Sequence, residues 1–243
     1  MKFKVLGSSS GFSEIGKNLS SVFVEVEGKC LIFDAGEGLS QRIQEEKLDY
    51  DTIDAIFISH YHPDHVTGLF MLIQVLYIQA RTKPLHIFLP ERVEEFANLL
   101  SFFYTFQKRL SFELYFLEMR TINKYYPYVK AFKNDHLLSY RKFVAKEKLP
   151  NTLSSYSFKI VEDNKSLIYT SDIQTIRSIS EHLSDCVYCI TDAFHPHINE
   201  IKALEHLVKE QVILTHGSTT GTNKLVKENK KYIYAEENKM YTF

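Results

Sequence analysis

Three histidines and one aspartate gather in a single short stretch of the chain, residues 59–68 (SHYHPDHVTG). Their spacing is H-x-H-x-D-H, which brings His60, His62, Asp64 and His65 within six residues. Imidazole suits zinc, iron or manganese, and a carboxylate adds negative charge. We therefore expect metal-ion chemistry at this stretch rather than a solvated polar loop, and the donors could serve two separate metal positions.

The segments on either side of this stretch would hold it in place. The apolar run Ile53 to Ser59 precedes it and is typical of a strand, and the apolar, helix-length run His65 to Ala80 follows it. Because side chains alternate along an extended chain, His60 and His62 would point to the same side. Asp64 and His65 would lie at the start of the helix and face a second metal position.

The H-x-H-x-D-H pattern after a strand resembles the signature of the metallo-β-lactamase-fold hydrolases. Other segments resemble further motifs of that family and follow in the family's order. The turn at residues 34–38 (DAGEG) is similar to the D-x-G-x-G turn of ribonuclease Z, whose aspartate supports the histidine loop by hydrogen bonding. His136 after a strand, Asp172 in Y-T-S-D and His216 in L-T-H resemble the remaining ligand motifs.

This resemblance implies two divalent metal ions as cofactors, zinc by default with manganese or iron as alternatives. It assigns the ligands as follows: His60, His62 and His136 for the first metal; Asp64, His65 and His216 for the second; Asp172 as the bridge. Two metals about 3.5–4 Å apart can clamp the attacking and leaving oxygens of an in-line displacement. They also lower the pKa of bound water, which Asp64 could orient or deprotonate.

A leaving alkoxide needs a proton, and histidine is the side chain best suited to supply it near neutral pH. The segment 191–197 (TDAFHPH) resembles a D-A segment of phosphodiesterase-like family members, in which a histidine follows shortly after. Ribonuclease Z carries a His-Glu-Ala-Thr stretch instead, and Thr191 stands where its histidine belongs. We predict His197 as the general acid, with His195 as the alternative.

The fold class implied by the resemblance is α/β, a four-layer αββα sandwich of two mixed sheets with helices outside. The pattern of apolar runs predicts hairpins over 20–33 and 155–170 and helices over 39–47, 91–106, 174–182 and 198–210. Further strands are expected at 2–6, 84–89, 112–119, 128–133, 186–190 and 212–214, and strand-like pieces of the tail at 231–234 and 239–242 would pair back onto a sheet. The aromatic side of 91–106, with Phe96 and Phe102, is expected to be core, and a homodimer face is the alternative.

Composition narrows the classes of function. The chain has 243 residues, 44% hydrophobic and 24% charged, so one globular domain over residues 1–243 is the simplest fit. The net charge of −1 gives no overall attraction to nucleic acid or membrane. The sequence shows neither a signal peptide nor an apolar run of membrane-spanning length. We expect Cys186 and Cys189 to be buried, reduced thiols. These features together favour the cytoplasm.

The best-supported function is a metal-dependent phosphodiesterase acting on a small, cyclic phosphodiester. Asp172 follows His136 by only 36 positions (172 − 136), and the modestly basic loop Leu137 to Ser154 is too short for the tRNA-gripping arm of long ribonuclease Z enzymes. RNA is therefore the weaker substrate, with ribonuclease Z-like cleavage as the first alternative. Ester, thioester or lactone hydrolysis and a non-hydrolytic role of the same fold are the others.

Overall fold

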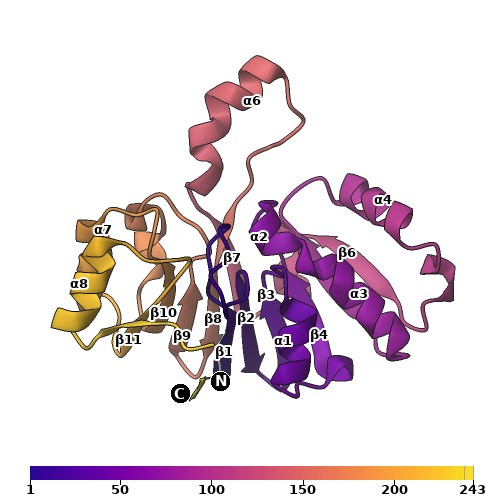
Figure 1. The fold of residues 1–243 in the computed structure, drawn as a ribbon, viewed down its shortest axis with the longest axis horizontal. Helices are drawn as coiled ribbons and strands as arrows, with labels where there is room; N and C mark the ends of the chain where they lie inside the picture. Colours follow the sequence, from indigo (N-terminus) through magenta and orange to yellow (C-terminus); the bar gives the residue numbers. More distant parts are fainter. Residues whose placement is uncertain (238, 243) are drawn as a thin grey trace. The chain divides into compact units, whose positions relative to one another are not determined.

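The computed structural model describes residues 1–237 and 239–242, which form two compact units. The first unit contains residues 1–121 and the tail from residue 236, and the second contains residues 122–235. Each unit is built on one mixed β-sheet with helices, as Figure 1 shows. The single domain expected over residues 1–243 stays a prediction.

In the first unit, the described strands lie in the order β13-β1-β2-β3-β4-β5-β6. Their bounds are β1 Lys2–Gly7, β2 Ser21–Val26, β3 Lys29–Phe33, β4 Ile53–Phe57, β5 Leu85–Leu89, β6 Leu114–Glu118 and β13 Met240–Thr242. Neighbours from β13 to β3 are antiparallel, and neighbours from β3 to β6 are parallel. Strands β1, β3 and β4 therefore run in the same direction, and the segments that follow them leave the same edge of this sheet.

Helices α1 (Leu39–Glu45), α2 (Pro63–Val66), α3 (Gly68–Ile78) and α4 (Val93–Phe103) belong to this unit. The single helix expected from His65 to Ala80 is thus two helices that meet at Thr67. Gly68 explains the close packing there, since a Cβ at this position would lie 1.9 Å from the main-chain oxygen of Gly36. Phe96 on α4 is core as expected, whereas Phe102 is 84% exposed, which corrects that part of the prediction.

In the second unit, the described strands lie in the order β12-β11-β10-β9-β8-β7. Their bounds are β7 Val129–Lys133, β8 Tyr156–Glu162, β9 Lys165–Tyr169, β10 Cys186–Asp192, β11 Gln211–Thr215 and β12 Tyr232–Tyr234. Because β8 is antiparallel to both β7 and β9, and β9 to β12 are parallel, strands β7, β9, β10 and β11 all point the same way. The loops after these four strands therefore meet along one edge.

The helices of this unit are α5 (Ile122–Tyr125), α6 (Arg141–Glu147), α7 (Ile198–Ala203) and α8 (Thr220–Glu228). The long helix expected over residues 198–210 is short, and the one expected over 174–182 is a 3₁₀ helix, Ile176–His182. Helix α8 was not predicted. The strand-like tail pieces do pair onto sheets, β12 beside β11 and β13 beside β1. Cys186 and Cys189 are free and buried, as predicted.

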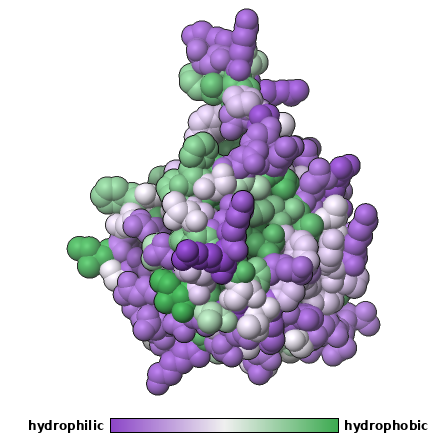
Figure 2. Space-filling model, turned by 90° about the vertical axis from the view of Figure 1, so that its right-hand side faces the viewer, coloured by the Kyte–Doolittle hydropathy of each residue, from purple (hydrophilic) through white to green (hydrophobic). Residues whose placement is uncertain are grey.

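The segment Leu137 to Ser154 was predicted to be a loop, and this was wrong. It carries α6, because residues 141–147 (RKFVAKE) contain good helix formers and neither glycine nor proline. We call residues 137–154 the arm, and α6 extends away from the strands of its own unit (Figure 1). In the space-filling view of Figure 2 the arm is the projection at the top, hydrophilic at its end. Among the described residues, no helix combines the length and hydropathy needed to cross a membrane.

Candidate metal centre

Asp34, at the end of β3, holds the histidine loop of the first unit in place. Its side chain is fully buried and accepts hydrogen bonds from Ser59 N at 2.7 Å, Ser59 Oγ at 3.0 Å and His65 Nδ1 at 2.8 Å. The backbone of Asp34 has a φ of 61°, a left-handed conformation that is uncommon for a non-glycine residue. This is the supporting role expected for the aspartate of the D-x-G-x-G turn.

The extended backbone after β4 sends alternate side chains in opposite directions. The ring of Tyr61 stacks on Phe96 with centroids 5.2 Å apart, and its hydroxyl donates to the main-chain oxygen of Glu91 at 2.7 Å. Burial raises the pKa of Tyr61 above its ordinary value, so its hydroxyl keeps its proton. The rings of His60 and His62 lie 4.6 Å apart, as the strand-like alternation predicted.

The four donors of this loop form one cluster within the first unit. The His60 ring lies 4.3 Å from the ring of His65, and His65 Nε2 lies 3.5 Å from Asp64 Oδ2. His60 Nδ1 is 2.9 Å from Ser59 Oγ, and His65 Nδ1 binds Asp34, so both Nδ1 atoms are engaged by supporting groups. This orientation turns the Nε2 atoms of His60 and His65 away from their supports, as in metal sites where one ring nitrogen is oriented and the other binds.

The second unit contributes its own cluster around Asp172. The Oδ2 atom of this buried carboxylate lies 3.1 Å from His216 Nε2 and 3.7 Å from His136 Nε2. These three residues follow β7, β9 and β11, whose ends meet at one edge of the sheet. The φ values of Ser171, 53°, and His216, 62°, show that the chain adopts left-handed turns as it leaves β9 and β11.

Asn134 and Asp135, which sequence reasoning did not select, tie this cluster together. Asn134 Oδ1 accepts from the backbone N–H of His136 at 3.2 Å, and Asn134 Nδ2 donates to the main-chain oxygen of Asp172 at 3.1 Å. The Asp135 carboxylate accepts from Thr175 Oγ1 at 2.6 Å and from two backbone N–H groups of the same loop. The residue types alone indicate a turn after β7. Only the hydrogen bonds of the folded chain show that these two side chains connect the segment after β7 to the segment after β9.

His195 belongs to the second-unit cluster, whereas His197 does not. The ring of His195 lies 5.0 Å from that of His136 and 5.3 Å from that of His216. Its Nδ1 lies 2.7 Å from the buried Asp192 Oδ2, and one donor atom each of Asp172, Asp192 and His195 lie within 4.8 Å of one another. His197 is exposed and accepts a hydrogen bond from Asn199 N as the cap of α7.

The donor atoms in each unit suit a divalent transition metal. Two ligands on one zinc ion, each bonded at about 2.0–2.2 Å, lie about 3–3.7 Å apart, which matches the separations around Asp172 Oδ2. A ligand set of imidazole nitrogens and carboxylate oxygens is compatible with zinc, manganese or iron. Buried histidine and aspartate side chains without a cation would instead carry a considerable desolvation cost.

The model of one protein family, described as anti-Pycsar protein Apyc1, matches residues 1–241. The chain belongs to this Apyc1 family. Curated relatives of this family member include ribonuclease Z of Thermococcus gammatolerans, 33% identical over 164 residues, or 63% of this chain and 51% of that protein. Ribonuclease Z of Pyrococcus abyssi is 42% identical over 86 residues, 35% of this chain and 28% of that protein. The matched part of the chain thus spans about half or less of the length of these relatives.

Solved structures resemble the Apyc1 family member over almost its whole length. The metallo-β-lactamase fold protein YhfI from Bacillus subtilis has a TM-score of 0.76 at 16% identity, covering 99% of this chain and 98% of that one. Human tRNase Z, short form, has a TM-score of 0.74 at 19% identity, covering 100% and 99%. Yeast PDE1 has a TM-score of 0.66 at 15% identity, covering 100% and 99%. The predicted α/β metallo-β-lactamase fold is confirmed.

Proposed function

We propose that this protein is a metal-dependent phosphodiesterase that hydrolyses a small, cyclic phosphodiester. The observation that carries this proposal is the Asp172 carboxylate, which lies beside both His136 and His216, with the His195–Asp192 pair in the same cluster. One carboxylate shared by two imidazoles suits a bridging ligand, and a histidine oriented by an aspartate suits a proton donor. Metal-assisted hydrolysis of a phosphodiester can use both functions.

The proposed ligand set follows the family order of motifs read from the sequence. Two divalent metal ions, of which zinc is the first choice, would supply an activated water and neutralise charge on the phosphate. The residues that would hold them are His60, His62, Asp64, His65, His136, Asp172 and His216. Asp64, at the start of α2, would also orient the attacking water by accepting a hydrogen bond.

We assign the general acid to His195 in preference to His197. Asp192 accepts hydrogen bonds from the backbone N–H groups of Phe194 and His195 and lies 2.7 Å from His195 Nδ1. This contact orients the ring and leaves Nε2 as the atom that would protonate the leaving oxygen. His197 serves as a helix cap, which accounts for its position without a catalytic role.

A metal measurement and a substrate panel together test the proposed function. Purified protein should contain close to two transition-metal ions per chain by elemental analysis. It should hydrolyse bis(p-nitrophenyl) phosphate and cyclic phosphodiesters much faster than p-nitrophenyl acetate or a simple lactone. Protein that binds no metal on addition, or that cleaves only the carbonyl substrates, would contradict the proposal.

Ribonuclease Z-like cleavage of RNA is the second candidate, favoured by the curated relatives and by the arm. The exposed end of the arm carries Arg141, Lys142, Lys146 and Lys148 against one acidic residue, Glu147. Such a cluster could contact several phosphates, and RNA binding of this kind weakens steeply with salt. Efficient removal of a pre-tRNA 3′ trailer at physiological salt, beside negligible turnover of cyclic phosphodiesters, would favour this candidate.

Matched variants can separate the two candidates. A Lys142→Ala and Lys146→Ala double variant should leave turnover of cyclic phosphodiesters within about twofold if the substrate is small. If the arm binds RNA through phosphates, the same variant should cleave the pre-tRNA about tenfold or more slowly than the unmodified protein. Lys224→Ala, at an exposed position of α8, is the control for loss of surface charge.

We further propose a cytoplasmic location, because the three cysteines are free thiols.

A further inference from the structure

The segment that leaves β1 is rich in glycine and serine, and we call residues 8–18 (SSSGFSEIGKN) the Gly/Ser-rich loop. Its tip extends into solvent, since Phe12 is 89% exposed and Ile15 is fully exposed. The loop also borders a cavity of about 860 Å³, which Gly11 and Ser13 help to line. With solvent on one side and a cavity on the other, the tip has room to shift.

The same loop packs against Asp64, one of the proposed metal ligands. A Cβ at Gly11 would lie 3.3 Å from Asp64 Oδ2 and 3.7 Å from Oδ1, so the backbone of the loop adjoins the carboxylate. The main chain of Asp64 is held elsewhere, against Gly36, where a Cβ would lie 2.5 Å from the Asp64 main-chain oxygen. The carboxylate can therefore turn only about its own side-chain bonds, and the Gly/Ser-rich loop closes one side of that rotation.

Backbone contacts close the base of the loop. Ser9 N donates to the main-chain oxygen of Asn18 at 3.0 Å, and Ser9 forms an isolated bridge with Leu19. Gly7, the last residue of β1, lies so close to Leu19 that a Cβ at Gly7 would be 1.7 Å from the Leu19 main-chain oxygen. These contacts bring the two ends of the loop together.

A carboxylate from the far end of the chain, that of Glu237, binds both ends of the loop. Its Oε1 atom accepts hydrogen bonds from Ser8 N and Ser8 Oγ, both at 2.9 Å, and from Asn18 N at 3.3 Å. Ser8 is only 4% exposed, so its N–H and hydroxyl would be costly to leave without an acceptor. Glu237 therefore satisfies buried donors at the point where the loop leaves β1.

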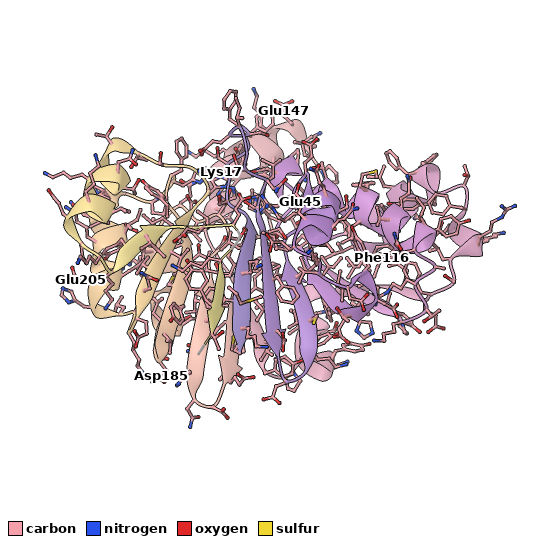
Figure 3. The ribbon with its side chains drawn as sticks, turned by 60° about the horizontal axis from the view of Figure 1, so that its bottom comes forward. Lys17, Glu45, Phe116, Glu147, Asp185 and Glu205 are labelled. Carbon is pink, nitrogen blue, oxygen red and sulfur yellow. The ribbon has the colours of Figure 1, made fainter. Side chains whose placement is uncertain are left out.

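Glu237 is itself fixed in place by α1 and by the tail strand. Its Oε2 atom pairs with Arg42 Nη2 on α1 at 2.7 Å, and charge-assisted bonds of this kind are stronger than neutral ones. After Glu237, the tail continues into β13, which pairs with β1. Figure 3 labels Lys17 in the Gly/Ser-rich loop and Glu45 at the end of α1. The tail therefore joins the loop to the helix and to the sheet of the first unit.

We propose that Glu237 is a positioning residue for the metal centre, because it holds the Gly/Ser-rich loop against Asp64 and so sets the direction of that carboxylate. A carboxylate held in its binding direction loses less conformational freedom when a metal binds, so the metal affinity is higher. Glu237 acts through the loop and touches neither metal nor substrate. This inference rests on the proposed function in taking Asp64 as a metal ligand.

Cleavage of the loop by chymotrypsin tests the first step of this proposal without any metal. Phe12 is an exposed site for this protease, and the cleavage rate reports how often the loop opens. Glu237→Ala should be cut after Phe12 about tenfold faster than the unmodified protein, because the loop loses hydrogen bonds to a charged group. Glu236→Ala, at the exposed neighbouring position that pairs with Lys239, is the matched control. Cleavage after the exposed Phe143 of the arm is the internal reference and should not change.

Metal affinity tests the second step. Competition for Zn²⁺ with a chromophoric chelator should give a dissociation constant about tenfold weaker for Glu237→Ala than for Glu236→Ala, the lower end of the usual cost of losing a group that orients ligands. Gly11→Ala reaches the same result by another route, because its Cβ would press on the Asp64 carboxylate while Glu237 keeps the loop closed. Gly11→Ala should weaken zinc binding and leave cleavage after Phe12 unchanged.

Two results would overturn the role of Glu237. One is equal cleavage after Phe12 in Glu237→Ala and Glu236→Ala, or an equal acceleration after Phe12 and Phe143. The other is faster cleavage after Phe12 with equal zinc affinity of the two variants, since the tail would then hold the loop without affecting the metal centre. If the unmodified protein bound zinc but hydrolysed no phosphodiester, the proposed function would fail, while a tenfold difference in zinc affinity would still support Glu237 as a positioning residue.

Discussion

Asn134 Nδ2 donates a hydrogen bond of 3.1 Å to the main-chain oxygen of Asp172, across the ends of β7 and β9. The same side chain accepts from the backbone N–H of His136. A single buried amide therefore links the backbones of two proposed ligands, and it fixes where each side chain starts.

Removal of this amide should weaken metal binding. Asn134→Ala should raise the metal dissociation constant by about 10- to 100-fold, the usual cost of losing a group that orients ligands. Competition with a chromophoric chelator measures this constant directly, and the visible spectrum of the cobalt-substituted protein reports the ligand geometry. The exposed Asn151→Ala in the same unit should change neither.

The shared carboxylate can be tested by an isosteric change. Asp172→Asn keeps the size of the side chain but removes its charge, so a bridging role predicts loss of at least one metal ion per chain and of most activity. Elemental analysis and turnover of bis(p-nitrophenyl) phosphate measure the two effects. Asp163→Asn, in the exposed turn between β8 and β9, is the control, and near-normal turnover in Asp172→Asn would show that another residue bridges.

The two histidines near β10 should behave differently. His195→Ala should lose about 10²–10⁴-fold on substrates with poor alkoxide leaving groups but little on p-nitrophenyl esters, whose leaving group needs no proton. His197→Ala should instead lose about 0.5–2 kcal/mol of stability as a helix cap and keep its leaving-group dependence. The reverse pattern would return the general-acid role to His197.

Arg81 should matter for stability and not for chemistry. Its buried guanidinium donates to main-chain oxygens of Tyr50, Ile53, Lys83 and Pro84, so it joins several loops of the first unit. Arg81→Met should lower the free energy of unfolding by about 2–4 kcal/mol, because buried acceptors lose their donors. Denaturant unfolding measures this, and unchanged stability would mean that water replaces the donors.

His86 should make the protein less stable in mild acid. Burial lowers the pKa of this imidazole below 6.5, since β5 and its neighbours disfavour the charged ring. The unfolded chain then binds the proton more readily than the folded one, so stability falls as pH drops through about 6.5 and levels off below the folded pKa. Unfolding free energies of His86→Gln between pH 7.5 and 5 should show a smaller slope than the unmodified protein.

Local order along the chain was enough to predict the histidine loop. The strand before it and the alternation of His60, Tyr61 and His62 depend on neighbouring residues, so period-two reasoning placed them correctly. The supporting role of Asp34 also followed from a short motif, because the turn it begins is itself local. Strand positions were predictable for the same reason, whereas α6 was missed because a short, exposed helix has no buried face to create a pattern.

Tertiary structure alone decided how the distant donors combine. His136, Asp172 and His216 follow three different strands, and they meet only because β7, β9 and β11 point the same way in one sheet. The spacing of the residues likewise could not distinguish His195 from His197 as the proposed general acid, because both histidines follow the same D-A segment. The distinction depends on a 2.7 Å contact between His195 and Asp192, which exists only once β10 has ended at the common edge and the loop has folded back on its carboxylate.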